Sequence, residues 1–202
     1  MQNLLKNILV NSKEKIKIIT KKILKYDKNY LLGENSSLSK NAIIINTKSA
    51  NLINIGKSSF ILGTLQIFDN GGKITIGDES FIGKDTLISS WESITIGNRV
   101  LISHNVNIFD SRSHPISAVI RNKHFRELLI EGNAKKTDLN CSPVLIEDDV
   151  WIGCMCIIHK GVTIGKGSII SAGSVVTKNV KEYTVVAGNP AIIIENLKIN
   201  DK

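Results

Sequence analysis

The sequence predicts an all-β fold, a parallel β-helix, and two observations carry this prediction. The first is a six-residue period, because an aliphatic residue recurs at every sixth position over long stretches of the chain. The second is the composition: aromatic residues make up only 5% of the 202 residues, while isoleucine is abundant, and β-branched side chains favour strands. The recurring residues are Ile55, Ile61 and Ile67; Ile76, Ile82 and Ile88; Ile96, Ile102 and Ile108; and Ile146, Ile152, Ile158, Ile164, Ile170 and Val176.

A period of six fits neither an α-helix nor a long alternating strand. It suits a short strand followed by a bend, with one residue of each strand pointing inward. Three such sides close a triangular coil of about eighteen residues, and each coil hydrogen-bonds to the next at about 4.8 Å. Ordinary strands that happen to share a spacing would not give the unbroken run of repeats that follows residue 146.

The β-helix is expected to span residues 41–197, with a long loop at 115–143 that interrupts the repeat. Residues 1–40 are expected to form a separate basic N-terminal segment. Within it, residues 1–28 hold eight lysines against Glu14 and Asp27, and so supply about six of the net charge of +8. Apolar residues recur there at near-helical spacing and predict an amphipathic helix: Leu5, Leu9, Ile16, Ile19 and Ile23.

This basic helix has two interpretations. It could touch an anionic membrane surface, or it could pack on its own chain or on a sister subunit, and the second interpretation is favoured. Binding of nucleic acid is not expected, because no aromatic platform or recognised motif accompanies the lysines.

The remaining composition indicates a cytoplasmic protein. Cys141, Cys154 and Cys156 are an odd number without metal-site spacing, which predicts reduced thiols. No signal peptide stands out, and no segment is long and apolar enough to span a bilayer.

Parallel crossovers are normally right-handed, so the hand of this coil has to come from a resemblance. The repeats resemble the hexapeptide-repeat acyltransferases over roughly residues 55–194. That resemblance implies a left-handed parallel β-helix that assembles as a homotrimer, with its active sites between subunits.

The C-terminal block narrows the resemblance to one branch. "VLIEDDVWIG", "GVTIGKGSIISAGSVVTKNV" and "YTVVAGNPA" resemble the galactoside, maltose and xenobiotic O-acetyltransferases, which include enzymes that modify bacterial surface polysaccharides. In that branch a His-Pro pair follows the third coil and a long loop comes next. Here His114 and Pro115 precede the loop, which has the composition of an arm that could cover an active site.

The resemblance implies acetyl-CoA as the co-substrate, direct transfer to a hydroxyl of a sugar or glycan, and His114 as the general base. An imidazole with a pKa of about 6.5 is suited to that step at neutral pH. Asp110, four residues earlier, either orients the ring or is a turn-forming residue.

The other site residues also follow from the resemblance. Trp151 would lie near the pantetheine arm and the acceptor, and Cys154 would line the thioester end, where a backbone N–H would stabilise the oxyanion. Ala172, Thr177 and Lys178 would contact the pantetheine and nucleotide parts of the donor. Asp85 and Trp91 are further candidates for contacts to the acceptor.

Three positions depart from the pattern of the family: Lys160, the pair Lys181–Glu182, and Ile192. Proline is usual at the first two places and a cation at the third, so the departures concern turns and one contact to the nucleotide. None involves His114 or Trp151.

Other functions remain open. The acceptor could be the amine of an amino sugar, a serine or an antibiotic. Carbonic-anhydrase-like proteins share the fold and bind zinc through three histidines, and His104, His114 and His124 are evenly spaced. That spacing does not match the faces of an eighteen-residue coil, so no metal site is expected. A non-catalytic scaffold is the third alternative.

Overall fold

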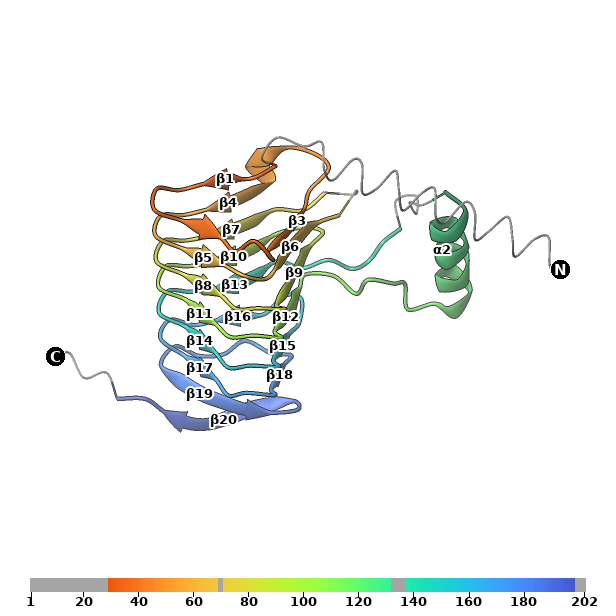
Figure 1. The fold of residues 1–202 in the computed structure, drawn as a ribbon. Helices are drawn as coiled ribbons and strands as arrows, with labels where there is room; N and C mark the ends of the chain where they lie inside the picture. Colours follow the sequence, from red (N-terminus) through yellow and green to blue (C-terminus); the bar gives the residue numbers. More distant parts are fainter. Residues whose placement is uncertain (1–28, 69–70, 132–136, 199–202) are drawn as a thin grey trace.

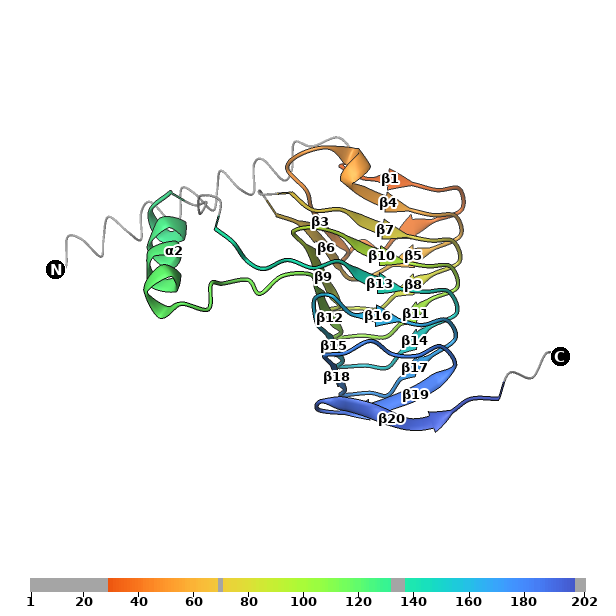
Figure 2. The same ribbon diagram turned by 180° about the vertical axis from the view of Figure 1, so that it is seen from behind.

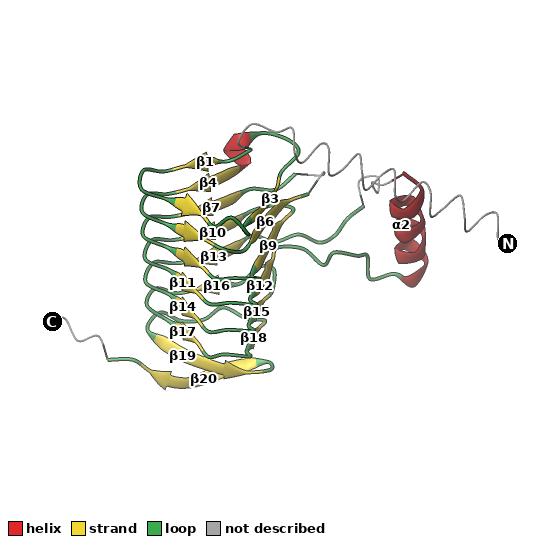
Figure 3. Cartoon of the chain, in the orientation of Figure 1, coloured by secondary structure: helices red, strands yellow, loops and turns green. Residues whose placement is uncertain are grey.

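The chain winds into a parallel β-helix with three flat sides. A computed structural model describes residues 29–68, 71–131 and 137–198. Figure 1 and Figure 3 show the coils stacked on one another, with an arm projecting from one side.

Each side of the β-helix is one sheet. Sheet A contains β1 (Leu31–Leu32), β4 (Ile53–Ile55), β7 (Ile74–Ile76), β10 (Ile94–Ile96), β13 (Val144–Ile146) and β16 (Thr163–Ile164). Sheet B contains β2 (Ser37–Leu38), β5 (Phe60–Ile61), β8 (Phe81–Ile82), β11 (Leu101–Ile102), β14 (Trp151–Ile152), β17 (Ile169–Ile170), β19 (Thr184–Gly188) and β20 (Ala191–Asn196). Sheet C contains β3 (Ile43–Ile45), β6 (Thr64–Ile67), β9 (Leu87–Ser90), β12 (Asn107–Phe109), β15 (Ile157–Ile158) and β18 (Val175–Val176).

The predicted six-residue period corresponds to three columns of inward-facing side chains. Strand pairing places these residues in register from coil to coil, and nearly all of them are fully buried. The columns are Leu32, Ile55, Ile76, Ile96, Ile146 and Ile164 in sheet A; Leu38, Ile61, Ile82, Ile102, Ile152, Ile170 and Val186 in sheet B; and Ile44, Leu65, Ile88, Ile108, Ile158 and Val176 in sheet C.

Two details of the prediction were wrong. Leu65, and not Ile67, is the register partner of Ile88, because the corner after Ile61 is short and Ile67 is a second buried residue of the same strand. The β-helix also begins at Leu31 rather than at residue 41. Its first coil was missed because it caps the solenoid, so that Leu32, Leu38 and Ile44 are only partly buried.

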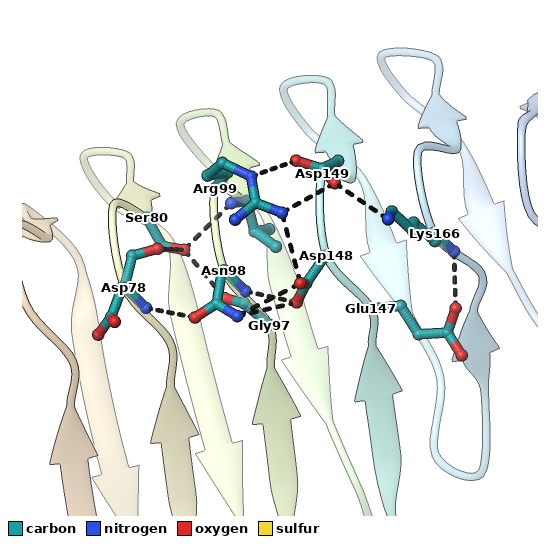
Figure 4. Close-up of polar contacts among 10 residues, drawn as sticks. Asp78, Ser80, Gly97, Asn98, Arg99, Glu147, Asp148, Asp149 and Lys166 are labelled. Atoms are coloured by element: carbon teal, nitrogen blue, oxygen red, sulfur yellow. Dashed lines mark hydrogen bonds and ion pairs between the residues drawn. The ribbon is translucent and has the colours of Figure 1, made fainter. Parts of the chain in front are cut away.

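The corner between sheets A and B carries a ladder of side chain–backbone hydrogen bonds (Figure 4). The Asp78 carboxylate accepts from the N–H of Lys57, Asn98 Oδ1 accepts from the N–H of Asp78, and Asp148 accepts from the N–H of Asn98. Each bond joins one coil to the next, so the polar corner and the aliphatic core both stabilise the stacking of the coils.

The arm leaves the β-helix after β12 and returns at β13 (Figure 2). Two backbone hydrogen bonds join its outgoing and returning segments at the base, Arg112 N–H to Leu139 O at 3.1 Å and Ser142 N–H to Asp110 O at 2.8 Å. The predicted loop contains a helix, α2 (Ala118–Glu131). Helical periodicity gave no signal for it, because its apolar side chains lie all around the helix instead of forming one stripe.

The remaining elements are short. A single 3-10 turn, η1 (Ala50–Leu52), precedes β4, and the antiparallel pair β19–β20 ends the stack. The predicted N-terminal amphipathic helix at residues 1–28 lies outside the described residues. Across the ranges that the structure describes, no helix is long and apolar enough to cross a membrane.

Candidate active site

His114 lies at the base of the arm, in a tight turn. Its backbone N–H donates to the carbonyl of Arg112 at 2.6 Å, and the residue between them, Ser113, has a φ of +61°, a conformation that non-glycine residues adopt at a cost. The segment that follows is held by Arg121 of α2, whose guanidinium donates to the carbonyl of Ile116 at 2.9 Å. The turn and the guanidinium therefore fix the backbone on both sides of the imidazole.

The side chain of His114 meets a second histidine, His124 of α2. The two Nδ1 atoms are 3.3 Å apart, and the rings are arranged edge to face, with centroids 5.3 Å apart and planes at 76°. His114 is exposed, whereas His124 is only 5% exposed. Burial lowers the pKa of His124, and the neighbouring His114 lowers it further.

A cavity of about 530 Å³ opens beside the two histidines, between the outgoing segment, α2 and the returning segment. Both signs of charge line it, with Arg112 and Lys123 against Glu127 and Asp138. The lining also contains apolar side chains, among them Ile116. A pocket with an apolar wall and a few convergent polar groups is typical of a small-molecule site.

Asp110 does not contact His114. Its carboxylate is fully buried and accepts three hydrogen bonds from the turn after β9: from Ser90 Oγ at 2.8 Å, from the N–H of Trp91 at 2.8 Å and from the N–H of Glu92 at 2.9 Å. Asp110 therefore stabilises a turn of the preceding coil, 18 to 20 residues earlier in the sequence, and not the local turn that the sequence suggested. The predicted orienting contact to His114 is not formed.

The two candidate acceptor residues lie apart from each other. Trp91 is half-buried and stacks on Phe68, with ring centroids 3.3 Å apart. Asp85 is exposed on the corner between β8 and β9 and pairs with Lys84 at 3.8 Å. Of these two residues, Trp91 contacts another predicted site residue, since its backbone N–H donates to the Asp110 carboxylate.

Trp151 points outward from sheet B and is 51% exposed. It continues a column of exposed apolar side chains formed by the strands above it: Phe60, Phe81 and Leu101. Among the described residues, no hydrogen bond, ion pair or ring contact joins Trp151 to His114. A partner surface is expected where such a column stays exposed.

The predicted donor residues occupy two corners of the last coils. Cys154 lies on the corner between sheets B and C, and its carbonyl accepts from the N–H of Gly173, the residue after Ala172. Cys154 and Ala172 therefore lie on adjacent coils. Thr177 and Lys178 are exposed and follow β18, at the next corner.

Of the three evenly spaced histidines, only His114 and His124 contact each other in the structure. His104 lies on the corner after β11, where the Asn105 side chain is 3.0 Å from its Nδ1, while His114 and His124 meet in the arm. The described part of the chain holds no group of three side chains suited to a metal ion.

Comparison with known proteins identifies the class. Residues 143–178 match the family described as bacterial transferase hexapeptide (six repeats), and residues 73–109 match the hexapeptide repeat of succinyl-transferase. The two matched stretches lie in the parallel β-helix, on either side of the histidine-bearing arm. Both matched stretches carry the repeats of hexapeptide transferases, and the predicted left-handed parallel β-helix is confirmed.

Individual relatives agree with this assignment. The galactoside O-acetyltransferase of Escherichia coli is 33% identical over 135 residues, which cover 67% of this chain and 60% of that enzyme. The hexapeptide-repeat acetyltransferase VCA0836 of Vibrio cholerae has 25% identity and a TM-score of 0.55, over 95% of this chain and 93% of that one. The N-acyltransferase AntD of Bacillus cereus, solved with dTDP and 3-hydroxybutyryl-CoA, has 24% identity and a TM-score of 0.65, over 92% and 88% of the two chains, and shares the fold. The chain spans 56% to 66% of the length of the first four curated relatives.

Proposed function

We propose that this protein is an acetyl-CoA-dependent O-acetyltransferase that acts on a hydroxyl of a sugar or cell-surface glycan. The observation that carries the proposal is the exposed imidazole of His114 at the mouth of the arm cavity. Its His-Pro segment, and the similarity to a galactoside O-acetyltransferase over 67% of the chain, support the choice of acyl transfer.

His114 would act as the general base. It takes the proton of the acceptor hydroxyl while that oxygen attacks the thioester carbonyl, and the imidazolium then returns the proton to the departing sulfur of CoA. One bond forms from oxygen to the acetyl carbon, and the bond from that carbon to sulfur breaks. No covalent acyl-enzyme is required, so both substrates are bound together.

The donor would lie along the later coils. The corner of Cys154 and Ala172 offers backbone groups near the thioester end, and a backbone N–H there would stabilise the oxyanion. Thr177 and Lys178 are exposed at the following corner, where the ammonium of Lys178 is available to a phosphate of CoA. Trp151 would line the passage between the donor and the acceptor.

Active sites between the subunits of a homotrimer account for the separation of His114 from Trp151. The exposed apolar column that includes Trp151 would be covered by a neighbouring subunit. The apolar side chains that α2 exposes, such as Val119 and Leu129, would also be covered there. The cytoplasmic location and a membrane contact by residues 1–28 stay predictions.

The test is an acceptor screen with labelled acetyl-CoA against capsule, lipopolysaccharide and nucleotide-sugar fractions. With a productive acceptor, free CoA should form with the acetyl ester, and His114→Ala should lower kcat by about 10²- to 10⁴-fold. Thr95→Ala, on the outer face of sheet A, is the control for the effect of expressing and purifying a variant, and should keep the wild-type activity. Full activity of His114→Ala would exclude His114 as the base, and product on an amino sugar alone would replace the hydroxyl acceptor by an amine.

A further inference from the structure

His124 is a second histidine beside the candidate base, and the proposed reaction gives it no role. It comes from α2, ten residues beyond His114, and its Nδ1 faces His114 Nδ1 at 3.3 Å. It is also buried, with 5% of its surface exposed. A buried imidazole in direct contact with the base can act on that base.

The contact restricts where protons can be. A neutral imidazole carries hydrogen on one ring nitrogen and a lone pair on the other. Two Nδ1 atoms can share a hydrogen bond only if one of them carries hydrogen and the other has the lone pair. The tautomers of His114 and His124 are therefore coupled through this single contact.

We propose that His124 is a positioning residue that accepts the Nδ1 hydrogen of His114 and so leaves the lone pair of His114 on Nε2, where it can take the proton of the acceptor. This inference rests on the proposed role of His114 as general base. It gives His124 the part that a carboxylate performs in many His-dependent enzymes, since Asp110 is engaged by Ser90, Trp91 and Glu92.

The surroundings of His124 favour this direction of the hydrogen bond. His124 must be neutral to accept, and burial together with His114 lowers its pKa. The charged groups that line the same cavity are Arg112 of the outgoing segment, Lys123 and Glu127 of α2, and Asp138 of the returning segment. Among them, Glu127 raises the pKa of His124, but burial has the larger effect.

The kinetic experiment uses two variants in the full chain. His124→Leu removes the acceptor, and His124→Asn keeps a side-chain oxygen near the position of Nδ1. We expect His124→Leu to lower kcat by about 10- to 100-fold, the usual effect of losing a group that orients a functional histidine. The KM for acetyl-CoA should stay unchanged, and His124→Asn should recover most of the loss. Equal loss in both variants, or an increase in the KM for acetyl-CoA in place of a fall in kcat, would overturn the proposal.

The tautomer can be observed without activity. ¹⁵N spectra of histidine-labelled protein should show hydrogen on Nδ1 of His114 in the wild type and in His124→Asn, and a shift toward the Nε2-protonated form in His124→Leu. His114→Ala identifies the His114 signals. An unchanged His114 tautomer in His124→Leu contradicts the inference even if that variant is less stable.

The two hypotheses can fail separately. If His114→Ala is fully active, the proposed base is wrong. If His114→Ala is inactive while His124→Leu keeps the wild-type kcat, only the role of His124 is wrong. Stoichiometric binding of zinc that His124→Leu abolishes would also overturn the inference, because a shared metal would then explain the short contact.

Discussion

Arg99 and Asp149 form a two-point ion pair between the coil that precedes the arm and the coil that follows it. Arg99 Nε is 2.6 Å from Asp149 Oδ1, and its Nη2 is 3.0 Å from Oδ2 (Figure 4). Asp148 adds a contact to the same guanidinium at 3.4 Å. Fifty positions of sequence, including the whole arm, separate these partners, so the pair helps to close the stack across the insertion.

This pair should make the stability depend on pH. The hydrogen bond from Arg99 lowers the pKa of Asp149, and the backbone N–H of Asn98 lowers that of Asp148. Their stabilisation is complete above the unfolded pKa of about 3.9 and is lost as the pH falls through the lower folded values. Arg99→Gln should therefore be less stable than wild type at pH 7, and this difference should shrink below about pH 4, as measured by thermal unfolding from pH 7 to pH 3.

Lys57→Gln is the matched control for Arg99→Gln. Lys57 pairs with Glu34 at 3.6 Å, but both side chains are largely exposed, at 64% and 80%, and such pairs contribute little. Its loss should leave the unfolding temperature unchanged throughout the range. A difference between Arg99→Gln and wild type that stays constant down to pH 3 would show that the guanidinium acts by packing alone.

Asp110 should prove structural. Asp110→Ala leaves the N–H groups of Trp91 and Glu92 without their buried acceptor, and is expected to lower the free energy of unfolding by about 2–4 kcal/mol. Denaturant unfolding measures this loss, with the exposed Asp85→Asn, which suits the backbone φ of +58° at that position, expected to change stability by less than about 0.5 kcal/mol. A variant at position 110 with wild-type stability and no activity would instead restore the catalytic role.

The repetitive part of the fold was predictable from sequence because one physical rule operates in every coil. An inward position must be aliphatic, and from Ile146 to Val176 nothing disturbs the count. The count fails where coils have unequal lengths. Ile44 and Ile55 are eleven positions apart, with η1 between them, whereas Ile61 and Leu65 are only four positions apart. Where a corner differs in length, the six-residue count no longer identifies the inward residue, and only the strand pairing in the structure does.

The candidate site was predictable only in part, because its geometry comes from an irregular segment. His114 was found through the motif around it, and Trp151 through its place in a repeat. The contact between His114 and His124 depends on how α2 folds back on the outgoing segment, and no local pattern encodes that. For Asp110, sequence separation was misleading, because its partners lie in the preceding coil instead of four residues away.

The inward columns should dominate stability, and one strand offers a matched pair of variants. In β10, Ile96 is 1% exposed while Thr95 points outward. Ile96→Ala removes buried methyl groups and leaves a cavity, and should lower the free energy of unfolding by about 2–5 kcal/mol. Thr95→Ala should change it by less than about 0.5 kcal/mol. Comparable effects of the two substitutions on chemical denaturation would mean that both faces of sheet A are covered.

If each active site combines His114 of one subunit with Trp151 of another, inactive variants should complement each other. His114→Ala and Trp151→Ala chains, co-expressed with different tags, form mixed trimers in which one of the three interfaces keeps both intact residues. Random assembly from equal amounts would recover about one quarter of the wild-type activity, whereas each variant alone stays at its residual level. Mixing the two purified homotrimers without subunit exchange is the control. Complementation requires only that the two side chains meet across an interface. If mixed trimers isolated through both tags are no more active than the parents, His114 and Trp151 therefore have separate functions.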